Sequence, residues 1–162
     1  MLTRNMIADL DLCLDEQICL YQELLSLAKQ GESLTDNEDL LINIQELLGK
    51  RSEKIAQIHQ VQEQLVSLCR DIAKSIGYEK NEINIYEFVP LVSKNADQKV
   101  QEIARLIKEI QTKDEQLSLF ISEKVEGIKQ KIKKVQVGIK SNKAYEPSTI
   151  QGEGVFIDQK IK

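Results

Sequence analysis

The chain has 162 residues, of which 41% are hydrophobic and 30% charged, and its formal net charge is −4. That apolar share is too high, and that net charge too small, for a chain disordered throughout. Three Phe, four Tyr and no Trp are too few aromatic residues for the core of a compact globule of this length. Long helices with narrow apolar seams fit this composition, and seven Gly, two Pro and one His are fewer than an enzyme usually needs.

The cysteines and the N-terminal residues indicate a compartment. Acidic side chains near the start leave no apolar stretch for a secretory signal, and no segment is apolar for long enough to cross a membrane. Cys13, Cys19 and Cys69 include no CxxC pair, and the first two lie on different faces of a helix. We interpret them as free thiols in a reducing cytosol and expect a cytoplasmic protein.

The first predicted helix covers residues 3–29. Its apolar residues follow an alternating four-and-three step, in which Gln17 is the one polar member. This step is the heptad pattern of helices that pack along a narrow seam. Gly31 should end the helix, because Gly favours the position just past a helix C-terminus.

The second predicted helix covers residues 36–76 and has the longest seam. Thr35 and Glu38 have the spacing of a capping box at its start, and Gly77 should end it. Two of its seam residues are polar. The predicted seam is Leu41, Ile44, Leu48, Arg51, Ile55, Ile58, Gln62, Leu65, Cys69, Ile72 and Ile76.

Residues 77–96 form a connection with many apolar side chains around Pro90. The segment is too short for a helix that spans the bundle, so we expect a short capping helix over residues 84–93, with a β-strand as the weaker alternative. Pro is tolerated in the first turn of a helix but not deep inside one. A third long helix is predicted over residues 97–137, where Asp114 interrupts the apolar stripe. Loop-forming residues then predict a flexible tail over residues 141–162.

These elements predict an all-α fold, an antiparallel three-helix coiled-coil bundle over residues 1–140. Short connections favour antiparallel neighbours. The second and third helices would each be roughly 60 Å long at 1.5 Å per residue, and the first is shorter. Part of the third helix should therefore lack a partner, and an exposed apolar stripe is usually a binding surface.

We assign partner binding to the distal part of the third helix and to the tail, with intramolecular core as the alternative for the helical residues. Tyr145 and Phe156 are included because apolar residues in a polar segment suggest a short binding motif. The candidate residues are Ile121, Val125, Ile128, Ile132, Val135, Tyr145 and Phe156.

No catalytic, cofactor or metal site is predicted. His59 is the only histidine and no cysteine shares its helical face, so the usual metal sites cannot form. Glu109 and Lys113 have the spacing of an ordinary ion pair on a helix surface. Residues 124–143 hold seven Lys against Glu126, but neither Arg nor an aromatic residue, so we expect no nucleic-acid readout.

The chain resembles flagellar type III export chaperones of the FlgN type. The similar motifs are Tyr21-x-x-Leu24-Leu25, Asp39-Leu40-x-x-x-Ile44 and Leu47-Leu48-x-x-Arg51, then Ile76-Gly77 before a short apolar helix. The ending Lys143-Ala144-Tyr145 and Gly154-Val155-Phe156-Ile157-Asp158-Gln159-Lys160 is similar to the tails of FliT-type chaperones. The chain departs from the FlgN type at Lys113-Asp114-Glu115-Gln116, where that type often has Asn.

This resemblance implies a cytoplasmic, non-catalytic chaperone without a cofactor. Such a protein binds the C-terminal helical segment of hook-associated or filament-cap subunits, prevents premature assembly, and delivers them to the export apparatus. Two alternatives are a coiled-coil protein that homo-oligomerises without a flagellar client, and a helical nucleic-acid-associated protein that uses the lysines. Stable membrane insertion is not expected.

Overall fold

The computed structural model describes residues 4–143, and these residues form an all-α fold, as predicted. Its helices are α1 (Arg4–Gln30), α2 (Leu40–Ser75), α3 (Ile85–Val92) and α4 (Lys94–Lys143), with a 3-10 turn at Gly31–Ser33 after α1. The chain divides into two compact units, Met1–Leu119 and Phe120–Lys162, and the boundary falls within α4. Each unit is described by itself.

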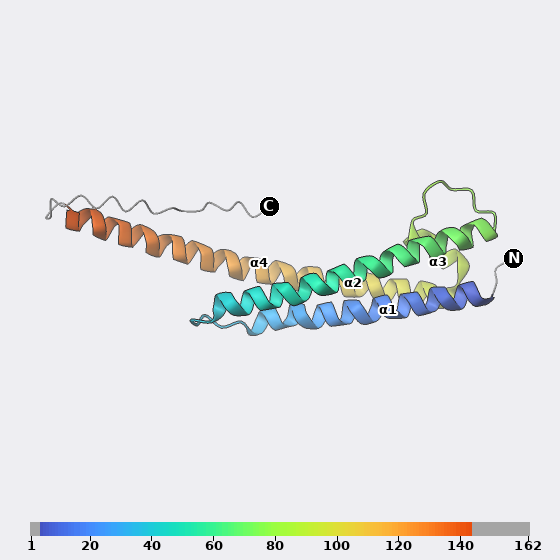
Figure 1. Ribbon diagram of the computed structural model, residues 1–162, viewed down its shortest axis with the longest axis horizontal. Helices are drawn as coiled ribbons and strands as arrows, with labels where there is room; N and C mark the ends of the chain where they lie inside the picture. Colours follow the sequence, from blue (N-terminus) through green and yellow to red (C-terminus); the bar gives the residue numbers. More distant parts are fainter. Residues whose placement is uncertain (1–3, 144–162) are drawn as a thin grey trace. The chain divides into compact units, whose positions relative to one another are not determined.

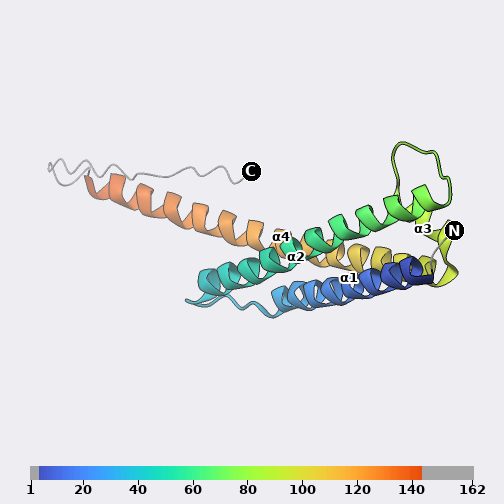
Figure 2. The same cartoon turned by 45° about the vertical axis from the view of Figure 1, so that its right-hand side comes forward.

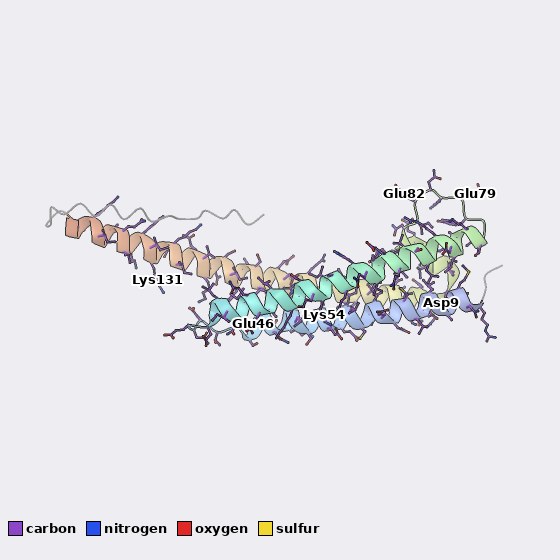
Figure 3. The ribbon with its side chains drawn as sticks, viewed as in Figure 1. Asp9, Glu46, Lys54, Glu79, Glu82 and Lys131 are labelled. Atoms are coloured by element: carbon purple, nitrogen blue, oxygen red, sulfur yellow. The ribbon has the colours of Figure 1, made fainter. Side chains whose placement is uncertain are left out.

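The first unit is a bundle of α1, α2 and the part of α4 up to Leu119, with α3 at one end. In both views α2 runs in the opposite direction to α1 and to this part of α4 (Figures 1 and 2). Glu79 and Glu82 lie on the loop that joins α2 to α3 (Figure 3). The predicted antiparallel arrangement of consecutive long helices is therefore present in this unit.

Two clusters of buried side chains hold the first unit together. The larger cluster draws on all four helices, and Leu10, Leu14, Cys69, Ile72, Val89 and Ala96 are fully buried in it. Phe88 of α3 is 1% exposed in the same cluster, so the short helix seals this end of the bundle. The smaller cluster joins three helices through Leu24, Leu25, Ile58, Leu106 and Ile110.

The seam of α2 differs from the predicted one in its first half. Leu41, Leu48 and Ile55 are exposed, whereas Leu40 and Leu47 are buried. Adjacent leucines occur at both places, so the spacing of apolar residues fits either member of each pair. The packing of the folded bundle buries one member of each pair and leaves the other at the surface.

The polar residues that interrupt the predicted seams meet one another across the bundle. The Gln17 side-chain amide donates to Gln62 Oε1 at 2.5 Å. Arg51 Nη2 donates to Asp114 Oδ1 at 2.5 Å, and Arg51 is only 9% exposed. Because a buried polar group without a partner is costly, these two pairs determine which residues of neighbouring helices lie level with each other.

The start of α2 is not the predicted capping box. The helix begins at Leu40, and its N-cap residue Asp39 accepts no hydrogen bond from the helix through its side chain. Instead, Asn37 folds the preceding turn: its Oδ1 accepts from the Asp39 N–H, and its amide donates to Thr35 Oγ1. The Asn side chain competes locally with the helix for these groups, as is common at such turns.

Two capping side chains and one proline set the bounds of α3 and the start of α4. Asn84 caps α3, since its Oδ1 accepts from the Tyr86 N–H at 3.1 Å. Pro90 lies in the last turn of α3 instead of the first, where only a short stretch of helix follows it. Ser93 Oγ then accepts from the Ala96 N–H at 3.2 Å, which lets α4 begin at Lys94, earlier than predicted.

The distal end of α4 also differs from the prediction. The helix continues through Gly138 to Lys143, past the predicted end at residue 137. A single exposed Gly weakens a helix by about 1 kcal/mol relative to Ala but does not end it. The rest of the predicted tail, residues 144–162, lies outside the described residues.

Ion pairs between helices use much of the acidic charge of α1. Lys99 of α4 bonds to Asp15 at 2.9 Å and lies 3.7 Å from Asp11. The predicted pair of Glu109 with Lys113 is absent: Glu109 bonds to Lys29 at 3.3 Å. Lys113 bonds to Glu32 instead, because α4 runs alongside α1 in the same direction and reaches the turn that follows α1 (Figure 1).

Gly77 ends α2 in the backbone conformation that glycine favours. Its φ is 70°, and the N–H of Tyr78 donates to the carbonyl of Ala73 at 2.9 Å. The N–H of Gly77 donates to Lys74, which completes a Schellman motif. The ring of Tyr78 then packs edge-on against Phe88, with the centroids 5.1 Å apart, so this stop also places α3.

Replacing this glycine should destabilise the bundle. We expect Gly77→Ala to lower the free energy of unfolding by about 1 kcal/mol, because a Cβ is strained at positive φ. Gly49→Ala is the matched control: no atom lies within 4 Å of its added Cβ, so it should stabilise the exposed helix by a similar amount. Urea denaturation measures both, and equal effects of the two variants would contradict the assignment.

Removing Asp114, the partner of Arg51, should lower the free energy of unfolding more than Gly77→Ala does. We expect Asp114→Ala to lower the free energy of unfolding by about 2 kcal/mol, since a buried guanidinium loses a charged hydrogen bond. The loss should stay below the value for a fully buried pair because the Asp114 side chain is 42% exposed. The neighbouring Glu115→Ala removes the same charge at an exposed position and should change stability little. An equal loss of stability in both variants would contradict a specific role of the Arg51–Asp114 pair.

Candidate partner-binding face

An apolar row follows one face of the described part of the second unit, residues 120–143 of α4. Val125, Ile128 and Val135 are 45%, 51% and 60% exposed, while Ile121 and Ile132 are half-buried. The alternating four-and-three step between them continues to Ile139, which is 49% exposed. We call these six residues the distal seam. The buried residues of α4 end at Leu117, so the pattern of the core continues into residues that no core covers.

Charge is divided unequally around the distal seam. At 100° per residue, Lys124, Lys129 and Lys131 flank it at roughly 40–100° from Ile128. The only acidic residues of this stretch, Glu123 and Glu126, lie on the opposite side, roughly 140–160° away. Lys124 Nζ also lies 5.5 Å from the centroid of the Phe120 ring. The result is an apolar row with a basic rim, on which Lys131 is labelled in Figure 3.

The predicted candidates of α4 thus lie on one face of one helix, whereas the two predicted tail residues lie outside the described residues. The structure adds Ile139 to the candidates. Ile139 lies past the predicted helix end at residue 137, although the heptad step in the sequence continues to it without a break.

A second apolar surface lies on the first unit. Leu41, Leu48 and Ile55 recur every seven residues along α2, and the row leads to a hollow of about 260 Å³. The hollow is lined by Tyr21, Leu24, Ile55, Ile58, His59, Gln62 and Tyr86. Burial, and then the neighbouring Tyr86, raise the pKa of the Tyr21 phenol, so this hydroxyl stays protonated at neutral pH.

The described residues carry no arrangement suited to metal binding. Within residues 4–143 no group of three or more His, Cys, Asp or Glu side chains could hold a metal ion. His59 is exposed on α2. In this part of the chain, no helix is both long and apolar enough to cross a membrane.

The three cysteines are free and differ in exposure, since Cys69 is buried, Cys13 half-buried and Cys19 exposed. Burial, with a smaller contribution from Cys13, raises the pKa of the Cys69 thiol to about 11. Burial and then Glu16 also raise the pKa of Cys13. Because the thiolate is the reactive form, these two thiols serve as core side chains and not as nucleophiles.

Thiol labelling tests this difference. At pH 8 we expect iodoacetamide to modify Cys19 first, and Cys69 only when the bundle unfolds, because Cys69 is both covered and protonated. Mass spectrometry of digested samples follows each site over time. Cys19→Ser should abolish the fast phase alone, and early labelling of Cys69 would show that the larger cluster opens locally.

The fold and the distal seam together define a class: an all-α protein with an exposed apolar row along one long helix. The family model described as FlgN protein matches residues 6–149, well over half of the chain, and the chain therefore belongs to the FlgN family. This family is one of flagellar export chaperones, so membership gives a general chaperone role. No curated protein and no solved structure gives a match. Of the residues similar to FliT-type tails, 143–145 fall within the matched range and 154–160 lie beyond it.

Proposed function

We propose that the protein is a cytoplasmic chaperone that binds the C-terminal helical segment of flagellar hook-associated or filament-cap subunits. It holds this segment until the subunit is delivered to the type III export apparatus. Membership of the FlgN family supports the chaperone role. The observation that carries the assignment of the surface is the exposed distal seam, whose heptad step matches that of the buried seams in the same chain.

The physical basis is the burial of apolar surface on both partners. An amphipathic helix that lies along the distal seam covers its Ile and Val side chains, and each Å² of apolar surface removed from water contributes about 25 cal/mol. A subunit segment held in this way cannot pair with other subunits. The protein would therefore delay assembly by competition, without ATP and without a covalent step. Tyr145 and Phe156 are proposed as further contacts with the subunit.

A second candidate function is homo-oligomerisation through the same face. It is favoured by one observation, the Ile and Val residues at every position of the distal seam, which are typical of oligomeric coiled coils. It predicts a species whose size grows with protein concentration and that has no affinity for flagellar subunits.

The decisive variant places a charge in the distal seam. We expect Ile128→Asp to weaken capture of hook-associated and cap proteins by at least tenfold, because the carboxylate must lose its hydration against an apolar partner. Capture should also require the C-terminal helix of the subunit. A pull-down with purified proteins measures both, and Ile128→Asp combined with Ile132→Asp should abolish capture.

The matched control is Val137→Asp. Val137 is 63% exposed on the same helix, about 180° from Ile128, so the same charge lies on the back face. It should leave capture unchanged, and circular dichroism should show equal helicity for all variants. Equal loss in both variants would mean that the seam is not the contact. No capture by the unmodified chain, together with concentration-dependent assembly, would favour homo-oligomerisation.

A further inference from the structure

The distal seam has the complete pattern of one strand of a coiled coil, flanks included. In heptad notation Val125, Ile132 and Ile139 occupy the a positions, and the other three residues of the seam occupy d. The flanking g positions before the first two of these residues are lysines, Lys124 and Lys131. Lys129 holds one of the e positions, next to Ile128. In coiled coils the e and g residues select the partner by charge.

Both edges of the distal seam therefore have the same sign. The e and g positions over residues 122–138 are otherwise Ser122, Gln136 and Gly138, so none of them is acidic. Both acidic residues of the stretch are on the back of the helix, where they cannot neutralise the rim toward a partner that lies on the seam. A basic rim attracts a helix whose seam is flanked by acidic residues and repels a helix whose seam is flanked by basic residues.

Two other occupants fit the pattern poorly. A second copy of this stretch would bring lysine opposite lysine, since g faces e in a parallel pair and g faces g in an antiparallel pair. A lipid surface attracts lysines, but helices that lie in it usually carry Trp, Phe or Leu on the apolar face. Residues 121–143 contain none of these three residue types.

We infer that the distal seam selects an amphipathic helix whose own seam is flanked by Glu or Asp. The inference rests on the proposed function and narrows it, because it specifies the chemistry of the subunit segment that binds. The apolar seam supplies most of the affinity. The lysine rim supplies the choice between segments and aligns the partner along the helix.

Two synthetic peptides of three heptads test the inference directly. They share Ile at a and Leu at d, and carry either Glu or Lys at every e and g position. At low salt we expect the full-length protein to bind the Glu-flanked peptide roughly tenfold or more tightly than the Lys-flanked peptide. The Glu side chains form several weak ion pairs with the lysine rim, whereas the Lys side chains are repelled by it. The preference should shrink as salt rises. Fluorescence anisotropy with labelled peptides measures both affinities.

Charge reversal on the two faces provides the control. Lys124→Glu, Lys129→Glu and Lys131→Glu together should reverse the preference toward the Lys-flanked peptide. Lys133→Glu, Lys134→Glu and Lys140→Glu make the same change in net charge, but these residues lie roughly 120–140° from Ile128, so the preference should persist.

Each outcome separates this inference from the proposed function. Equal binding of both peptides, or binding of neither, overturns the inference, whereas the subunit pull-down judges the chaperone role. If the protein prefers the Glu-flanked peptide but captures no subunit, the inference of an acid-flanked partner helix stands, and the proposal that this partner is a flagellar subunit fails. A third outcome is that neither peptide is preferred, but the protein binds vesicles of phosphatidylserine and phosphatidylcholine and loses this binding only when Lys124, Lys129 and Lys131 are replaced by Glu. The lysine rim would then be a membrane contact, which overturns the inference.

Discussion

The first unit depends on the requirement that polar groups inside a helical bundle find partners. Its seams are not purely apolar: Gln17, Arg51, Gln62 and Asp114 interrupt them, and the structure joins these residues into two pairs. A shift of one helix past another by a single turn would leave a buried guanidinium and a buried amide without partners. Apolar side chains tolerate such shifts far better, so the polar pairs provide the alignment and the apolar clusters most of the stability.

Charge is used in two different ways along α4. In the first unit, Lys99, Glu109 and Lys113 bond to α1 and to the turn that follows it, and so join neighbouring elements. In residues 120–143, lysines flank an exposed seam and the acids are on the back. The same residue types thus form ion pairs between elements in one stretch and flank an exposed apolar row with a single sign of charge in the other.

Helix α4 also shows how one periodic pattern serves two purposes. Its heptad step is continuous, yet its buried positions end at Leu117. The apolar residues beyond that point have the composition of a core without the covering of one.

Much of the fold could be read directly from the residues. The four-and-three step predicted three long helices, Gly77 marked the end of the second one because a left-handed turn favours glycine, and the apolar patch around Pro90 indicated the short cap. The alternation of apolar residues also led to the distal face, because periodicity is a local property that each helix carries by itself.

The choices between equivalent local patterns were decided by tertiary structure. Leu40 or Leu41, and Leu47 or Leu48, fit the same period, and only the packing of the folded bundle selects the buried member. Likewise Glu109 pairs with Arg105 along its own helix, but only the packing of α4 alongside α1 brings Lys29 within reach as well. The sequence by itself determined the period of the apolar residues and where α1 and α2 end, because periodicity and a glycine stop are local properties. Tertiary contacts decided what each face and charge meets, because those distances depend on residues far away in the chain.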